Sequence, residues 1–211
     1  MVKFEKVSYE EWARTIGTMI NMDEAKTDED KKEIETVKNA LLANYEKITL
    51  PKRATTNSAG YDIFSPFDLT LLPNVWTFVP TGIKMKVTDN EKVCLIIAPK
   101  SGLGFNYMTR LANTIGVIDA DYYGNPTNEG HIFIKIANGQ TFEGCPVKPV
   151  TDIRTAQKSF QLDMDAEETQ ARILRIDLGK AFVQGIIVPY ITAEEDAVTE
   201  ERNGGLGSTN A

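Results

Sequence analysis

The chain has 211 residues, and 23 Lys and Arg stand against 30 Asp and Glu, so its formal net charge is −7. This length fits one domain with additional segments, and an apolar content of 42% is enough to build a core. The acidic balance argues against a nucleic-acid or membrane-surface binder, which needs a basic face. A local basic pocket for a small anion is still compatible with it.

Histidine and cysteine are scarce in this sequence. The single histidine, His131, argues against His-rich zinc sites and a Ser-His-Asp triad, and we interpret it as an ordinary strand or loop residue. Cys94 and Cys145 form no Cys-x-x-Cys pair, so neither a structural zinc site nor a disulfide framework is expected. The N-terminus has no apolar signal-peptide core, and no apolar stretch approaches the roughly 18 residues of a membrane helix. We therefore expect a cytoplasmic protein.

Residues 8–46 have a helical pattern. Ser8 and Glu11 form a capping-box signature, and Thr27 with Asp30 offers a second helix start. Apolar residues at helical spacing follow the two starts, and these are Trp12, Ile16, Met19 and Ile20, then Ile34, Val37, Leu41 and Leu42. The sequence predicts a helical N-terminal extension over residues 1–46. It either packs against the main domain as a hairpin or serves as an assembly or partner-binding element.

From Ile48 onward, short apolar or alternating runs are separated by Pro, Gly, Asn and Asp. The runs are Leu69–Leu72, Val75–Val79, Gly82–Val87, Lys92–Ala98, Thr114–Ile118, His131–Ala137 and Phe182–Ile191. Many short strands punctuated by turn residues indicate an all-β sandwich or barrel, and the absence of βαβ alternation disfavours a doubly wound sheet. We expect this β domain to cover residues 47–199.

Two further segments depart from the strand pattern. Residues 138–176 are rich in Gly, Pro and polar residues, and they end in a charged stretch, 163–172, that predicts a short helix capped by Asp163 or Asp165. We interpret this segment as an insertion, serving as surface ornament or as a lid or interaction surface. Residues 200–211 are glycine-rich with almost no apolar anchors, which predicts a flexible C-terminal arm.

Five glycine-marked patches could carry chemistry. The second of them combines a cation, a hydroxyl and free backbone N–H groups at Lys100, Ser101 and Gly102, which suits phosphate oxygens. The third places two carboxylates and an aromatic in one hairpin. In chain order the patches are AGYDI (59–63), APKSGL (98–103), GVIDADYYGN (116–125), LGKAFVQGII (178–187) and RNGGLGST (202–209).

Each patch alone is weak, but the set in this order resembles the trimeric dUTPase family over residues 51–209, interrupted by 138–176. Additions of this kind resemble a phage or prophage member. The resemblance implies a jelly-roll β-barrel, hydrolysis of dUTP to dUMP and pyrophosphate with Mg²⁺, and a homotrimer whose subunits share each active site. The protein would then work in the cytosol of a bacterial host.

The resemblance also implies roles for residues of the third motif. Asp119 matches the carboxylate that polarises the attacking water, and Tyr122 matches the aromatic that lies under the deoxyribose and excludes a 2′-hydroxyl. Backbone groups from Gly116 through Val117 and Ile118 to Tyr122 would read the uracil edge. Two further positions match contacts near that edge, and these are Asn113 and Gly130.

The remaining matched positions concern the phosphates and the metal. Lys100, Ser101 and Gly102 match the phosphate-binding second motif, and Gln184 matches a phosphate-contacting glutamine. Asp62 matches an acid that touches Mg²⁺ through water. Residues of the C-terminal arm would clamp the terminal phosphate and close over the base, and these are Arg202, Leu206, Gly207 and Ser208.

The sequence departs from the family at five places, two of which are Asn210 in place of a glycine and Arg202 one residue closer to the following glycines; the other three change side chains of the motifs. Lys100 replaces an arginine and loses its bidentate fork, Lys180-Ala181 replaces an acid–arginine pair, and Leu206 replaces a phenylalanine. These departures keep open a weakly active or inactive regulatory protein on the same scaffold, with a protein partner bound through residues 1–46 or 138–176. A dCTP deaminase is a remote alternative, because that chemistry needs a strand glutamate where Lys135 stands.

Overall fold

The computed structural model describes residues 1–20, 27–89, 91–151, 158–196, 198–199, 202 and 204. Strands outnumber helices in it. The strands are β1 (Val2–Lys6), β2 (Lys52–Arg53), β3 (Gly60–Phe64), β4 (Leu69–Leu71), β5 (Trp76–Pro80), β6 (Ile83–Val87), β7 (Val93–Pro99), β8 (Arg110–Leu111), β9 (Gly116–Ile118), β10 (Phe133–Ala137), β11 (Val147–Thr151), β12 (Lys158–Leu162), β13 (Leu174–Ile176) and β14 (Ala181–Pro189). The helices are α1 (Tyr9–Met19), α2 (Asp28–Ala43), α3 (Ser101–Tyr107) and α4 (Glu167–Gln170), with 3₁₀ turns η2 (Asn44–Lys47) and η3 (Ala120–Tyr122).

The strands form small antiparallel sheets around one core. The largest has the order β2-β3-β14-β7-β9, and a second has the order β5-β10-β8. Two-stranded sheets pair β1 with β6 and β4 with β13. We call these sheets together the β body. Inward-facing apolar side chains fill the space between them, and six that are almost fully buried are Leu71, Val79, Leu95, Ile97, Ile136 and Phe182. The predicted mainly β fold class is confirmed.

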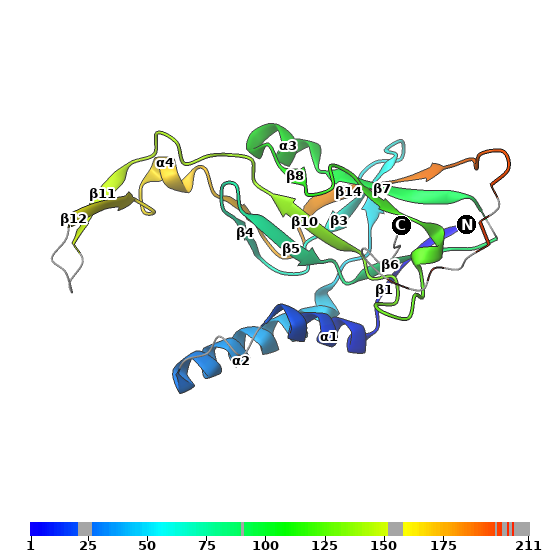
Figure 1. Cartoon of the computed structure of the whole chain (residues 1–211), viewed down its shortest axis with the longest axis horizontal. Coiled ribbons are helices and arrows are strands. Elements are labelled where there is room, and N and C mark those ends of the chain that lie inside the picture. Colours follow the sequence, from blue (N-terminus) through cyan, green and yellow to red (C-terminus); the bar gives the residue numbers. More distant parts are fainter. Residues whose placement is uncertain are drawn as a thin grey trace.

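The N-terminal extension contains the predicted helices but begins with a strand, so the description of residues 1–46 as wholly helical is wrong at its start. The strand β1 pairs with β6 from Val2↔Val87 to Lys6↔Ile83. It was missed because its partner lies about 80 positions away in the chain, beyond any local pattern. The helix α1 buries Trp12 and Ile16 completely, and α1 and α2 lie against one side of the β body (Figure 1).

The segment 138–176 extends away from the β body as an arm that carries β11, β12 and α4 (Figure 1). The hairpin β11–β12 was not predicted. The short helix was, but its cap is Ala166 without a side-chain hydrogen bond, so the expected Asp163 or Asp165 cap is wrong. Both carboxylates instead pair with Lys148, at 3.0 and 2.9 Å. The segment's last residues return to the β body as β13.

Asn138 closes the base of this arm. Its side chain is fully buried, and its Nδ2 donates to the carbonyl oxygens of Leu71 at 3.0 Å and Arg172 at 2.7 Å. The outgoing and returning chains are therefore tied to the same strand of the β body. Among the helices that the structure describes, none is both long and apolar enough to cross a membrane.

Candidate active site

Four of the predicted nucleoside-binding residues meet in one small cavity of about 60 Å³. Asn113, Gly116, Val117 and Ile118 all line it, together with Ile97, Leu111, Phe133, Ile134 and Lys135. Gly116 is needed at the wall because a Cβ there would approach the Ile97 Cβ to 3.2 Å. The structure therefore brings together the part of the third motif that we expected to read a base.

Asp119 and Tyr122 follow the cavity residues in the chain: Asp119 directly precedes the short turn η3, and Tyr122 is the last residue of that turn. Asp119 is about half exposed, whereas Tyr122 is only 7% exposed. The Tyr122 hydroxyl donates to the His131 carbonyl oxygen at 3.2 Å and accepts from Asn128 Nδ2 at 2.7 Å. Burial raises the pKa of this phenol, so the hydroxyl stays protonated and keeps its ring in one orientation.

Gly130 packs against the backbone of Tyr122. Its φ is +86°, and a Cβ there would lie 2.6 Å from the Tyr122 carbonyl oxygen and 2.8 Å from the Tyr123 Cα. Only glycine fits this close approach. The predicted contact of Gly130 with substrate is not shown; what the structure places here is a support directly beneath Tyr122.

Arg202 closes over this cluster. Its Nη2 lies 2.5 Å from Asp119 Oδ2, its Nε lies 3.0 Å from Asp121 Oδ1, and its Cζ lies 5.6 Å from the centroid of the Tyr122 ring. The guanidinium thus contacts the expected catalytic carboxylate and the expected sugar-stacking ring. The other predicted residues of the C-terminal arm, Leu206, Gly207 and Ser208, lie outside the described residues.

The predicted phosphate-binding residues form a second cluster. Lys100 Nζ lies 2.6 Å from Asp62 Oδ1, and Gln184 is opposite Asp62 across β3 and β14. Ser101 and Gly102 open α3 with exposed backbone next to Lys100. The helix itself was not predicted, because its two glycines lower helix propensity. A cavity of about 320 Å³ adjoins this cluster and is lined partly by Pro99 and Ser101.

Within one chain the two clusters lie at opposite ends of β7. Ile118, just before Asp119, is opposite Leu95, whereas Lys100 directly follows the other end of the strand. Five residues of extended chain span about 17 Å. A single chain therefore separates Asp119 from Lys100 by about this distance, whereas Gly116 of the cavity is opposite Ile97, three residues from Lys100.

The donor set around Asp62 does not form a closed metal site. Among the described residues, no group of three or more His, Cys, Asp or Glu side chains is arranged to hold a metal ion. Asp62 offers one carboxylate with an 18% exposed side chain, already in contact with Lys100. This suits a cation that arrives with phosphate oxygens and keeps most of its waters, as Mg²⁺ does.

Sequence reasoning missed the residues that support the third motif from behind. His131 is fully buried and bonds to Glu11 of α1, so its interpretation as an ordinary residue was incomplete. Glu11 had been assigned to a capping box. The Ser8 hydroxyl does accept from the Glu11 amide at 3.1 Å, but the Glu11 carboxylate turns inward. Ser8 and Glu11 gave only a local signal, and nothing in the sequence pointed from α1 to a loop 120 positions later.

A small cavity lined by the third motif and followed directly in the chain by Asp119, on an antiparallel β body with a separate cationic turn, is compatible with a protein that binds a nucleotide. The dUTPase family model matches residues 46–143. The deoxyuridine 5′-triphosphate nucleotidohydrolase of Lactococcus lactis subsp. lactis (strain IL1403) is 34% identical over 166 residues, which cover 78% of this chain and 89% of the relative. The chain belongs to the dUTPase family.

Two further similarities agree with this assignment. The deoxyuridine 5′-triphosphate nucleotidohydrolase of Aeromonas hydrophila subsp. hydrophila is 37% identical over 119 residues, 54% of this chain and 74% of the relative. A point mutant of the dUTPase from phage phi11 of S. aureus, described with a coordinated structural Mg(II) ion, is similar in structure with a TM-score of 0.51 and 25% identity. That similarity covers 74% of this chain and 92% of the phage protein, and it confirms the jelly-roll-like fold that the motifs implied.

Proposed function

We propose that this protein hydrolyses dUTP to dUMP and pyrophosphate. The observation that carries the proposal is the cavity formed by Asn113, Gly116, Val117 and Ile118, followed directly by Asp119, in a chain of the dUTPase family. The curated relatives described above act on deoxyuridine 5′-triphosphate by name. The backbone groups at the wall of this cavity would read the edge of a planar base.

Asp119 is the general base in this proposal. It takes a proton from a water molecule as the water oxygen bonds to the α-phosphorus. The bond from that phosphorus to the oxygen that bridges the α- and β-phosphates then breaks, and pyrophosphate leaves with the electron pair. Tyr122 supports the deoxyribose, and its fixed ring leaves no space for a 2′-hydroxyl.

The phosphates are held by the cluster around Lys100 and by the C-terminal arm (residues 200–211). Lys100 and the backbone of Ser101 and Gly102 neutralise and bind phosphate oxygens, with Gln184 beside them. Arg202 exchanges its ion pairs with Asp119 and Asp121 for the terminal phosphate when dUTP enters. This exchange frees the Asp119 carboxylate for the water, while Leu206, Gly207 and Ser208 cover the base.

Mg²⁺ is the metal that fits the phosphate side of the site. When bound, it would supply positive charge that offsets the charge developing on the leaving pyrophosphate. Asp62 would hold one of its waters, and Lys100 keeps that carboxylate oriented toward the phosphates. The proposal needs no closed protein cage, which agrees with the single carboxylate present.

The separation of the two clusters along β7 supports a homotrimer with shared sites. A triphosphate with its α-phosphate beside Asp119 would need Lys100 as a phosphate ligand, and its own chain holds Lys100 about 17 Å from that position. A neighbouring copy can supply them. Exposed apolar side chains near both clusters, such as Val117 (51%) and Phe105 (90%), suit burial between copies.

A regulatory role has one observation in its favour. The arm of β11, β12 and α4 projects from the β body and exposes Phe160 and Val147, at 76% and 58%. A protein partner could bind there or on residues 1–46. Replacing Asp119 by Asn separates this role from catalysis, because a pure scaffold keeps its cellular effect when hydrolysis is lost.

The primary test incubates purified protein with dUTP, UTP, dTTP and dCTP, with and without Mg²⁺, while pyrophosphate and ammonia are measured. We expect Mg²⁺-dependent pyrophosphate from dUTP alone. Absence of turnover by folded protein would favour the regulatory role. Ammonia from dCTP would establish the deaminase alternative, for which Lys135 stands at the wrong position.

A further inference from the structure

The helix α1 is tied to the loop behind Tyr122 at two points. The first is Glu129, whose carboxylate accepts from the Ser8 backbone N–H at 3.1 Å, from the Ser8 hydroxyl and from Lys84 Nζ at 2.8 Å. Ser8 is the N-cap of α1. The start of α1 is therefore fixed directly to the loop that follows the third motif.

The second point is a buried contact between Glu11 and His131. Glu11 Oε1 lies 3.1 Å from His131 Nδ1 and accepts from the Thr15 hydroxyl at 3.0 Å, while Arg14 binds the same carboxylate with Nε and Nη2. The Gly82 backbone N–H donates to His131 Nε2 at 2.9 Å. Because Nε2 accepts, the proton of the neutral ring is on Nδ1 and points at Glu11.

The ionisation of the two groups agrees with this geometry. Burial alone would raise the pKa of Glu11, but the hydrogen bonds from His131, Arg14 and Thr15 lower it to about 2. Burial lowers the pKa of His131 below its usual value even though Glu11 opposes this. A charged carboxylate thus faces a neutral imidazole at neutral pH.

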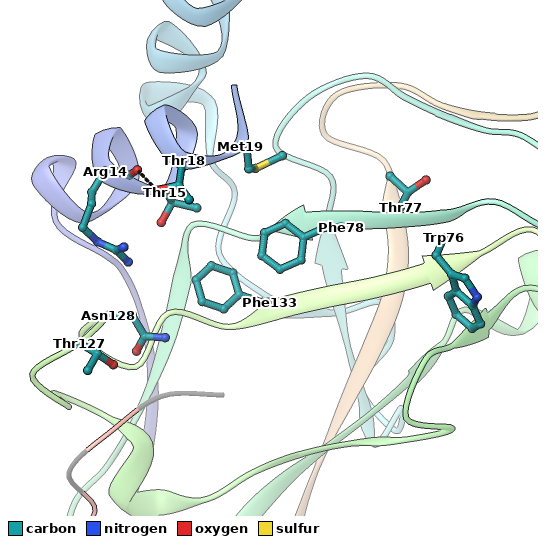
Figure 2. A pocket seen from close by; sticks show the side chains of 10 residues that line it. All are labelled: Arg14, Thr15, Thr18, Met19, Trp76, Thr77, Phe78, Thr127, Asn128 and Phe133. Carbon is teal, nitrogen blue, oxygen red and sulfur yellow. Dashed lines mark hydrogen bonds between the residues drawn. The ribbon is translucent and has the colours of Figure 1, made fainter. Parts of the chain in front are cut away.

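The loop 128–131, which α1 contacts through Glu129 and His131, in turn fixes the position of Tyr122. The His131 carbonyl accepts from the Tyr122 hydroxyl, and the His131 N–H donates to the Asn128 carbonyl at 2.8 Å. Asn128 donates to the same Tyr122 hydroxyl, and Gly130 packs under the Tyr122 backbone. Figure 2 shows Asn128 and Arg14 lining one side of a cavity of about 890 Å³ where α1 faces this loop.

We propose that Glu11 and His131 are positioning residues that let α1 fix the orientation of Tyr122 and thereby set the preference for deoxyribose over ribose. The inference rests on the proposed function, because it assigns to Tyr122 the contact with the sugar. The family model begins at residue 46, so this support comes from a segment outside the matched region. A ring held at both its hydroxyl and its backbone cannot retreat from a 2′-hydroxyl.

The test compares Glu11→Ala with Glu10→Ala, which removes the neighbouring exposed carboxylate of the same helix. The first readout is the ratio of kcat/KM for dUTP to that for UTP. We expect Glu11→Ala to lower this ratio about tenfold or more, since small misplacements at a reacting centre are costly. Glu10→Ala should leave the ratio unchanged, and Glu11→Gln, which retains an acceptor for the His131 N–H, should restore most of it.

The second readout uses His131 as the only histidine of the chain. In ¹⁵N-histidine-labelled protein, one pair of ring nitrogen signals reports the Nδ1–H tautomer directly. We expect it in the wild type and in Glu10→Ala, and a shift toward mixed tautomers in Glu11→Ala. A purely structural role would lower the melting temperature of Glu11→Ala and leave the ratio unchanged, which would overturn the proposal.

Binding of dUDP and UDP separates this inference from the proposed function. If the wild type fails to hydrolyse dUTP, the proposed function fails, and titration with the two diphosphates still examines the sugar preference. A preference for dUDP that is reduced in Glu11→Ala supports the positioning role. A preference that is unchanged in Glu11→Ala, or absent from the wild type, overturns it. If Glu11→Ala does not fold, Ser8→Ala, which removes the hydroxyl bond to Glu129 and leaves the Ser8 backbone N–H bond in place, is measured in the same way.

Discussion

Arg202 has two sets of partners in the proposed cycle. Before substrate binds, its guanidinium contacts Asp119 and Asp121 and covers the Tyr122 ring. The fork geometry lets one side chain bind two carboxylates, and it equally suits two phosphate oxygens. The same residue can therefore hold the empty site closed and later bind the substrate.

Replacing Arg202 by Lys keeps the charge and removes the fork. We expect kcat/KM for dUTP to fall roughly tenfold to a hundredfold, because charge-assisted hydrogen bonds of this kind contribute about 1.5–3 kcal/mol. Steady-state kinetics measure the effect. Arg175→Lys, at an exposed arginine of β13 that contacts Gln170, is the matched control and should behave like the wild type. Equal kinetics for the two variants would count against a phosphate role for Arg202.

Gly130 and Gly124, in the same loop, allow backbone strain at positive φ to be distinguished from a steric clash of an added Cβ. Both have positive φ, +86° and +74°, but a Cβ at Gly130 meets the Tyr122 and Tyr123 backbone, whereas a Cβ at Gly124 meets nothing within 4 Å. We expect Gly124→Ala to cost about 1 kcal/mol of unfolding free energy, from backbone strain alone. Gly130→Ala should cost several kcal/mol and also reduce dUTP hydrolysis. Thermal unfolding and activity together check this, and similar losses in both variants would contradict the backbone contact.

At the scale of elements, the attachment of α1 makes stability depend on pH. The pKa of Glu11 falls from 4.5 in the unfolded chain to about 2, so its contribution is present above pH 4.5 and is lost as the pH falls toward 2. The pKa of His131 is also lowered, from 6.5, so the unfolded state takes up that proton first and stability declines below pH 6.5. Both groups therefore weaken the fold on acidification.

Urea unfolding between pH 7 and pH 3 measures this dependence. We expect Glu11→Gln to lose roughly 2–3 kcal/mol at pH 7 and to show a flatter curve below pH 4.5. His131→Gln should flatten the decline between pH 6.5 and pH 5, because the chain has no other histidine. A decline in that interval that survives in His131→Gln would show that other groups cause it.

The sequence predicted those elements whose signals are local. Helices over α1 and α2, most strands of the β body and the gathering of Asn113 with Gly116–Ile118 followed from periodicity and motif order. What it could not supply depends on contacts distant in the chain. The strand β1 needs β6, and the inward turn of Glu11 needs His131. The separation of Asp119 from Lys100 follows from strand register, which no motif encodes.

At the scale of the whole molecule, sites shared between copies can be tested by mixing variants. Asp119→Asn and Lys100→Ala should each be nearly inactive alone, because each removes one half of every site. In trimers reassembled from equal amounts, a site is intact only when its Asp119 comes from a Lys100→Ala copy and its Lys100 comes from an Asp119→Asn copy. About one quarter of the sites then meet this condition, and about a quarter of the wild-type activity should return.

The mixing experiment has a clear control. Refolding each variant alone through the same denaturation step should give no recovery, and the double variant Asp119→Asn/Lys100→Ala mixed with either single variant should also stay inactive. If each chain carried a complete site, the equal mixture of single variants would be as inactive as its components.

The hydrogen bonds of Asn138 at the base of the arm bear on how members of this family diverge. Because the buried Asn138 amide binds the carbonyl oxygens of both Leu71 and Arg172, the geometry at the root of the arm does not depend on the residues between Asn138 and Arg172. Long surface loops cost little extra closure entropy as they lengthen. Natural selection can therefore lengthen, shorten or exchange the arm while the nucleotide cavity stays as it is. New surfaces can evolve at this root without an intermediate that has lost its fold.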